Sequence, residues 1–218
     1  LAARRGSEGR RAADVLLRAA KAASDAGDAR DESYALGWLG GLYERSGRSD
    51  DALSLTRRAL RAGMRADAPD AIYRWQWQAG RIQRASGHVD EALAADREAV
   101  ATLARLRADT AAAGSDLTAA LGATGDLYTE LVDLLLGRVA AVSDGAERQA
   151  LLREALQALE SQKVNELRDY FRDECLAAQH EAAPDAIPGT LVVYPVSLPD
   201  RLELIVGGSG GLEHFSVP

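Results

Sequence analysis

The stretch DALSLTRRAL, residues 51–60, recurs as RAADVLLRAA at residues 11–20 and as EALAADREAV at residues 91–100. The first alanine of the stretch therefore falls at intervals of forty residues, at Ala12, Ala52 and Ala92. Gly40 precedes the copy at residues 51–60, and Gly80 precedes the copy at residues 91–100 at the same distance. A fixed period of this length is typical of solenoids, in which similar supersecondary units stack on one another. The sequence therefore predicts an array of helical hairpins.

Small residues at fixed places predict how the two helices of a hairpin meet. Gly40 in the first helix and Ala52 in the second allow a close approach where the helices cross, and Leu36 and Leu39 fill the space beyond. Gly47 supplies the left-handed residue that ends the first helix. The next hairpin repeats this arrangement forty residues further on.

The pattern resembles the tetratricopeptide repeat (TPR), which has a small residue at its eighth position and alanines at its twentieth and twenty-seventh. One copy, counted from Ser33, places these residues at Gly40, Ala52 and Ala59. A second copy, counted from Tyr73, places them at Gly80, Ala92 and Ala99. The resemblance implies a TPR-like superhelix over residues 1–109.

The chain departs from the TPR pattern in its period and at two positions. The period exceeds the usual TPR length of about 34 residues, and we expect the additional residues in the inter-repeat helix ends or loop, near residues 62–70. Thr56 and Asp96 stand where TPR sequences usually have a large apolar residue.

The forty-residue period fades after Thr110. Leucines at roughly helical spacing predict one long helix over residues 115–142, and a second over residues 147–178. We interpret residues 110–183 as a long capping hairpin that ends the solenoid.

The composition changes near Pro184, because five of the six prolines lie at or beyond it. Residues 191–194 and 202–206 are β-prone, and a tight turn at residues 198–201 joins them. A glycine-rich turn precedes a third run, at residues 212–217. These runs predict an antiparallel β meander over residues 184–218. Such a meander buries little by itself, so we expect one face and an open edge to pack against further sequence of a longer protein.

Two segments resemble the opening of a CHAT domain, the caspase-like domain that follows TPR arrays in bacterial proteins. They are ESQKVNELRDYFRDEC at residues 160–175 and VYPVSLPDRLEL at residues 193–204. The resemblance implies that the strands begin a caspase-like α/β domain. In this family a His/Cys pair performs the chemistry and lies beyond the first strands. We therefore expect no enzymatic activity from this chain, while the sequence leaves open whether a full-length protein is a cysteine peptidase.

The cysteine and histidine content predicts no catalytic or metal site in the chain. Cys175 is the only cysteine, and the carboxylates of Asp173 and Glu174 are expected to raise the pKa of its thiol. We interpret it as a structural residue. His180 and His214 are widely spaced and form no ligand pattern, so no metal or other cofactor is expected.

Two stripes on the first helices of the hairpins form a candidate peptide groove. Side chains at helical spacing define the stripes, at Tyr34, Trp38, Gly41 and Arg45, and at Arg74, Trp77, Arg81 and Arg84. Trp75 and Ile82 are predicted to point into the core. Guanidinium groups beside a flat aromatic surface favour a protein or peptide partner that carries acidic residues. The alternative interpretation is an ordinary solvated helix face.

Composition and charge narrow the class of function. The 218 residues are 47% hydrophobic and 27% charged, which predicts a folded chain, and no apolar run is long enough to cross a membrane. The net charge of -7 argues against binding to nucleic acid or to an anionic membrane. We expect a cytoplasmic interaction segment of a regulatory TPR–CHAT protein, partnered also by the remainder of its own CHAT-like domain. A pure TPR scaffold, or the sensor portion of a bacterial signalling or transcription regulator, remains an alternative.

Overall fold

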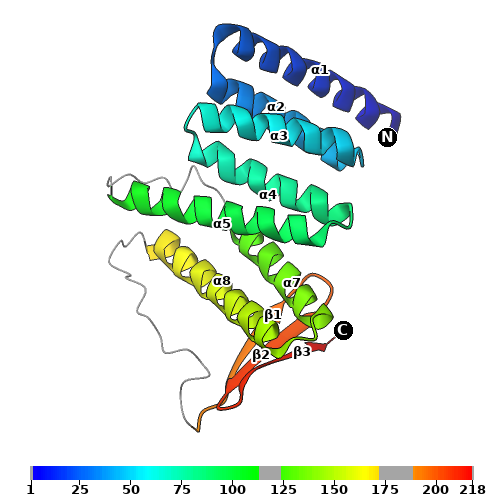
Figure 1. Cartoon of the computed structure of the whole chain (residues 1–218). Helices are drawn as coiled ribbons and strands as arrows, with labels where there is room; N and C mark the ends of the chain where they lie inside the picture. Colours follow the sequence, from blue (N-terminus) through cyan, green and yellow to red (C-terminus); the bar gives the residue numbers. More distant parts are fainter. Residues whose placement is uncertain (1, 113–123, 172–188, 218) are drawn as a thin grey trace. The chain divides into compact units, whose positions relative to one another are not determined.

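The computed structural model describes residues 2–112, 124–171 and 189–217. The chain is mainly helical, with a small antiparallel sheet near its C-terminal end (Figure 1). It divides into two compact units, Leu1–Leu121 (unit 1) and Gly122–Pro218 (unit 2). The boundary predicted after residue 109 falls inside a helix that continues to Ala112.

Unit 1 is a succession of helices joined by short turns. Its described helices are α1 (Ala2–Ala26), α2 (Ala29–Arg45), α3 (Ser49–Arg65), α4 (Pro69–Ala85) and α5 (Val89–Ala112). In Figure 1 they run back and forth, so that consecutive helices lie against each other. The loop between the two hairpins, residues 66–68, is as short as the turns within them. The residues that lengthen the period therefore lie in the helices.

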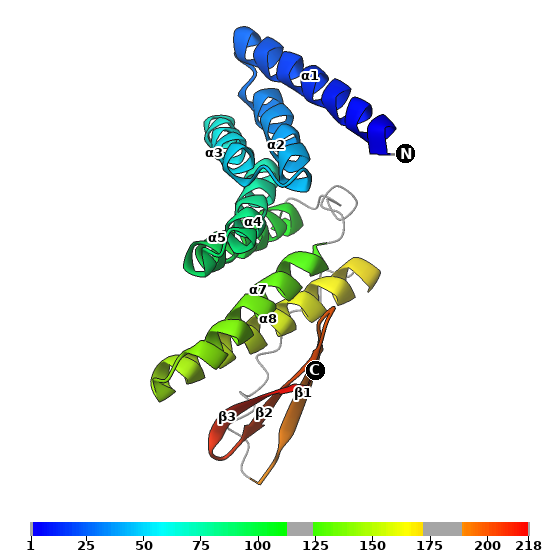
Figure 2. The same ribbon diagram turned by 90° about the vertical axis from the view of Figure 1, so that its right-hand side faces the viewer.

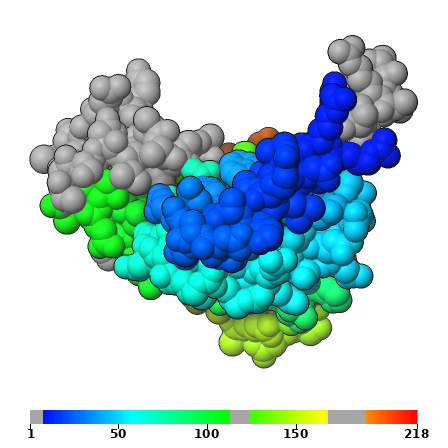
Figure 3. All heavy atoms as spheres, turned by 90° about the horizontal axis from the view of Figure 1, so that it is seen from above, coloured from blue at the N-terminus to red at the C-terminus, as the bar shows by residue number. Residues whose placement is uncertain are grey.

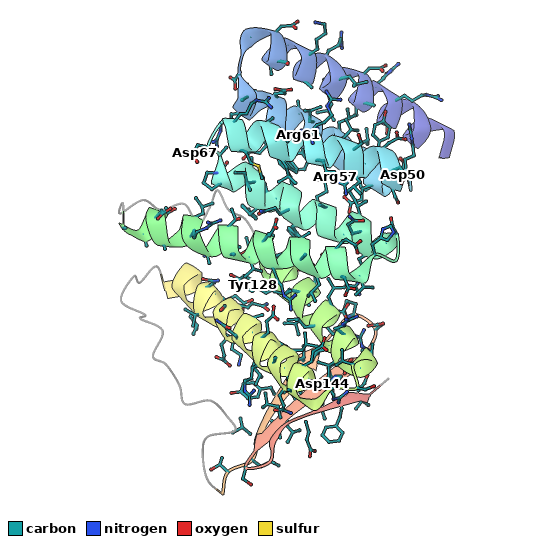
Figure 4. The ribbon with its side chains drawn as sticks, in the orientation of Figure 1. Asp50, Arg57, Arg61, Asp67, Tyr128 and Asp144 are labelled. Atoms are coloured by element: carbon teal, nitrogen blue, oxygen red, sulfur yellow. The ribbon has the colours of Figure 1, made fainter. Side chains whose placement is uncertain are left out.

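The turns of unit 1 share one geometry. A residue in the left-handed region follows each of the helices α1 to α4, at intervals of twenty residues, at Gly27, Gly47, Asp67 and Gly87. The next backbone amide then donates to a carbonyl of the preceding helix, as from Arg48 to Tyr43 over 3.0 Å. This closure satisfies helix-end carbonyls and reverses the chain within three residues. Asp67 lies at such a turn in Figure 4 and, among the described residues, is the non-glycine residue with a positive φ, of 46°.

Small residues bring the helices of a hairpin together, as predicted. Ala52 and Ala59 are fully buried, and a Cβ atom on Gly40 would lie 3.3 Å from the carbonyl oxygen of Ala52. Thr56, a departure from the TPR pattern, is buried at this crossing, with its hydroxyl donating to the Ala52 carbonyl over 2.8 Å. Since Gly40 has no side chain, it leaves room for this polar group.

Trp75 forms the centre of the seam between hairpins, and it is buried as predicted, with only 3% of its surface exposed. A Cβ atom on Gly37 would overlap its ring, so α4 can approach α2 only at a glycine. The indole Nε1 donates to the Ser33 hydroxyl over 3.0 Å, and this hydroxyl donates to the Ala59 carbonyl over 2.8 Å. Ile82 is also buried, as predicted. These bonds fix the register of three helices.

Unit 2 consists, within its described residues, of a helical pair and a three-stranded sheet. The helices are α7 (Gly125–Ala141) and α8 (Gly145–Phe171), which lie side by side in Figure 2. The strands are β1 (Val192–Ser197), β2 (Leu202–Gly208) and β3 (Gly211–Val217), in the order β1-β2-β3 and antiparallel throughout. The predicted meander is therefore present.

The helix predicted over residues 115–142 begins later in the structure. Thr124 has φ -103° and ψ 1° and stands before the first turn of α7, so a continuous helix through this residue is wrong. Residues 113–123 and 172–188 lie outside the described residues. The buried face of α7 contains the predicted leucines Leu127, Leu131, Leu134 and Leu135.

A glutamine joins the sheet to the helical pair. The Gln149 side-chain amide on α8 donates to the Leu212 carbonyl over 2.7 Å and accepts from the Leu212 amide over 3.0 Å. Both backbone groups of Leu212 thus bond to α8 at the outer edge of β3. Unit 2 therefore combines the helical pair with the strands that the sequence analysis separated at residue 184.

Candidate functional site

The predicted stripe residues of α2 and α4 lie at or near the surface of unit 1. Trp38 is 52% exposed, Arg45 and Arg84 are exposed, and the remainder are half-buried, namely Tyr34, Arg74, Trp77 and Arg81. Gly41 does not belong to the exposed face, because it is buried and a Cβ atom there would lie 3.0 Å from Oε1 of Gln78. The other seven residues define what we call the α2–α4 face.

Tyr34 connects α2 to α4 at one end of the face. Its hydroxyl donates to the carboxylate of Asp70, which also lies 2.6 Å from Nη2 of Arg30. Burial and the bond to the Asp70 carboxylate raise the pKa of Tyr34 to about 12. Since this hydroxyl already has a partner within the array, Tyr34 has a structural role in holding the two helices together.

Trp38 occupies the middle of the face and is held by the core. Its ring meets the ring of Trp75 edge to face, with centroids 5.9 Å apart and an interplanar angle of 82°. Tyr34 approaches Trp75 in the same manner, with centroids 5.9 Å apart and an angle of 78°. Such edge-to-face contacts stabilise a defined ring orientation. The exposed indole of Trp38 is therefore positioned before any partner binds.

Arg81 closes the other end of the face. Its Nε and Nη2 donate to Oε1 and Oε2 of Glu44 over 2.9 and 3.2 Å, and its guanidinium lies 4.8 Å from the centroid of Trp77. A bidentate pair of this kind also connects α2 to α4. Glu44 and Asp70 are not among the residues predicted for the face. Their spacing is a signal that can find them, because each carries the opposite charge about forty residues from the arginine that it binds.

The face carries positive charge within an acidic protein. Helix α4 contains three arginines and one aspartate, a net charge of +2, whereas the whole chain carries -7. Arg45 on α2 adds an exposed cation next to Gly41, with its Nη1 3.5 Å from a Cβ position there. The arrangement therefore offers a fixed aromatic surface beside guanidinium groups, which can bind apolar side chains and carboxylates.

A second polar cluster lies in unit 2 and includes His214. Glu203 on β2 is only 2% exposed. Its carboxylate accepts hydrogen bonds from Arg201 and, over 3.1 Å, from the Ser216 hydroxyl. It also lies 2.7 Å from Nε2 of His214. Burial raises the pKa of Glu203, but the hydrogen bonds from Arg201 and His214 outweigh it, so the net direction is downward. Arg201 also binds Asp133 on α7. The cluster joins the sheet to the helices.

The remaining candidates give no further site. Cys175 and His180 lie outside the described residues. Within the ranges that the structure covers, no group of three His, Cys, Asp or Glu side chains could hold a metal ion. In the same ranges, no helix has the length and apolar character needed to span a bilayer.

Comparison with known proteins adds little to this geometry. No protein-family model matches the chain, and no curated protein matches its sequence. Five chains of solved structures match. One is the crystal structure of BtubC (BKLC) from P. vanneervenii, which is 16% identical, with 83% of this chain and 81% of that chain covered and a TM-score of 0.45. A likeness at this level carries no functional information, so function is inferred from the residues themselves.

Proposed function

We propose that unit 1 is a TPR-like module for protein–protein interaction and that its α2–α4 face binds a peptide segment rich in acidic residues. The observation that carries this proposal is the state of Trp38, which is half exposed yet held in a fixed orientation by Trp75. Exposed tryptophans of this kind are typical centres of protein interfaces, because a large apolar surface is buried without further ordering of the side chain.

The charge of the face supports an acidic partner. Guanidinium groups bind carboxylates in a bidentate manner, and they favour partners of opposite charge as they approach. We assign the partner's carboxylates to the guanidinium groups of Arg45 and Arg84, because both side chains are exposed to solvent. Trp38 then receives an apolar side chain of the same peptide.

We assign unit 2, within the same proposal, to the opening of a CHAT-like, caspase-like domain of a bacterial cytoplasmic protein. The outer face of the sheet supports this assignment, because it is apolar and exposed at Val193, Leu202, Phe215 and Val217. Apolar faces of this kind are normally covered by further structure. The chain itself is then a regulatory segment without peptidase activity, since the resemblance places the His/Cys pair beyond the first strands.

Selection of peptides on the full chain tests the proposed face. Random peptides displayed on phage are enriched on the unmodified chain, and the enriched peptides are titrated by fluorescence anisotropy. We expect acidic sequences, which bind the Trp38→Ala variant and the Arg45→Glu, Arg84→Glu double variant at least about tenfold more weakly, as for a residue at the centre of an interface. Met64→Ala is the matched control, because Met64 on α3 is similarly exposed at 60%.

Two results would overturn the proposal. One is that no peptide is enriched on the unmodified chain. The other is that enriched peptides bind the Trp38→Ala variant as tightly as the unmodified chain while its helical circular dichroism is intact.

A further inference from the structure

Helix α1 repeats the sequence of the second helix in each hairpin, but its equivalent surface is uncovered. The equivalent small residues of α3 and α5 are buried. The five alanines are fully buried and the one threonine is 4% exposed, at Ala52, Ala59, Ala62, Ala92, Ala99 and Thr102. Forty residues before the first three stand Ala12, Ala19 and Ala22, and all of these are exposed. The difference in burial lies in the surroundings, because the residue types are the same.

The exposed residues form one continuous face. Ala12, Val15, Ala19 and Ala22 follow each other at spacings of three and four residues, so they lie in a row along α1. Val15 is 53% exposed. The neighbouring side of the helix is occupied, since Ala20 is buried in the cluster that contains Leu36 and Trp75. In Figure 3 the outer surface of α1, in dark blue, faces the viewer without another helix of unit 1 over it.

The two complete hairpins specify what covers such a face. In each, an antiparallel helix crosses at a glycine, since a Cβ atom on Gly40 would lie 3.3 Å from the Ala52 carbonyl, and one on Gly80 would lie 3.4 Å from the Ala92 carbonyl. Leu36 and Leu39, which are buried, flank the first crossing. The occupant of an equivalent face therefore needs a glycine at the crossing and leucines beside it.

We propose that the α1 face (Ala12, Val15, Ala19 and Ala22) is a docking site for an amphipathic helix that runs antiparallel to α1 and presents a glycine opposite Ala12. The partner has the chemistry of α2. Docking continues the existing stack, because it reproduces on the outer side of α1 the interface that α2 makes with α3. The site is separate from the α2–α4 face and does not depend on the function proposed for that face.

The first test uses a peptide with the sequence of residues 29–45, labelled for anisotropy and titrated with the full chain. We expect saturable binding that Ala19→Arg weakens at least about tenfold, since a buried alanine contact becomes a clash with a long charged side chain. Leu17→Arg is the matched control, because Leu17 is 46% exposed but lies off the α1 face. The peptide is expected to bind this variant as tightly as it binds the unmodified chain. Replacing Gly40 by Leu in the peptide is expected to abolish binding.

A second arm covers the case of a peptide too short to form a stable helix alone. Residues 1–8 are replaced by a copy of residues 29–48, which keeps the forty-residue register and raises the effective concentration of the helix. We expect the thermal midpoint of unit 1, followed by tryptophan fluorescence, to rise by at least about 4 °C. The same extension with leucine in place of its crossing glycine is expected to give no rise.

The proposal is overturned if neither arm shows binding or stabilisation, or if Leu17→Arg weakens peptide binding as much as Ala19→Arg. It is also overturned if sedimentation equilibrium of the unmodified chain shows a dimer that Ala19→Arg abolishes. In that case a second copy of α1, rather than a helix of the α2 type, covers the face.

Discussion

Unit 1 and unit 2 hold their elements together by different means. In unit 1, neighbouring helices approach through glycine and alanine, and the contacts recur at the period of the sequence. In unit 2, Gln149 on α8 bonds to β3 and Arg201, directly before β2, binds Asp133 on α7, across 63 and 68 residues of chain. The packing of unit 1 is therefore specified repeatedly along the sequence, with polar bonds such as that of Arg81 to Glu44 added to it. The polar contacts that join the sheet of unit 2 to its helices have no such repeat.

The largest effect is expected in unit 2, from Arg201→Met. This change leaves the carboxylates of Glu203 and Asp133 without their shared guanidinium, and removal of one partner from a buried ionic cluster costs about 3–5 kcal/mol. We expect unit 2 to unfold at lower urea concentration by circular dichroism. The three tryptophans, all in unit 1, should report an unchanged transition. Asp200→Asn is the control, because that side chain is 73% exposed.

Gly37→Ala tests the corresponding point in unit 1. The new methyl group overlaps the ring of Trp75, and overpacking of this kind costs about 1–3 kcal/mol. The tryptophan-detected transition should move to lower urea concentration. Gly9→Ala on α1 is the matched control within unit 1, since no atom beyond the adjacent turns of its own helix lies within 4 Å of its Cβ position and alanine favours the helix. An unchanged transition for Gly37→Ala would show that the seam does not need close approach.

Alkaline pH tests the contact that Tyr34 makes in unit 1. The folded pKa of Tyr34, about 12, lies above its ordinary value of 10.0. The contribution of this hydroxyl to stability is therefore complete below pH 10 and is lost as the pH rises toward 12. We expect the tryptophan-detected stability of unit 1 to fall over this range, and Tyr34→Phe to flatten the fall while costing about 1 kcal/mol at neutral pH. A variant with the same alkaline profile as the parent would contradict the assignment.

The smallest effect is expected at the turn between α3 and α4. Asp67 adopts the left-handed conformation that Gly47 adopts at the preceding turn. Asp67→Gly should therefore stabilise unit 1 by about 0.5 kcal/mol, and Gly47→Asp should destabilise it by a similar or larger amount. Thermal unfolding of both variants measures the two shifts, and the same sign for both would refute equivalence of the turns.

The sequence predicts unit 1 well because its packing is periodic. Buried Ala52 and Ala59, the closely approached Gly40 and the core Trp75 all follow from residue size at fixed spacing. Gly41 is wrongly predicted to lie on the surface. Helical spacing places it beside Trp38 and Arg45, but it does not reveal that glycines of α2 face α4 as well as α3.

Prediction from sequence is weaker where the contact partner comes from a distant segment. Glu44 and Asp70, which bind residues of the α2–α4 face, were missed, as were Gln149 and Glu203 in unit 2, because nothing local distinguishes these polar residues from solvated ones. The start of α7 was missed for a related reason. Leucine spacing continues through Thr124, whereas the backbone there is outside the helix.

The uniform turns of unit 1 have a consequence for how such a protein changes over time. Because each reversal closes in the same way and recurs every twenty residues, the chain can be cut and rejoined at equivalent reversals with every neighbouring surface still matched. A duplication or loss of forty residues in the gene would then lengthen or shorten the stack by one whole step. The length of the stack would then change by one hairpin at a time, while the residues and contacts of every remaining hairpin would stay the same.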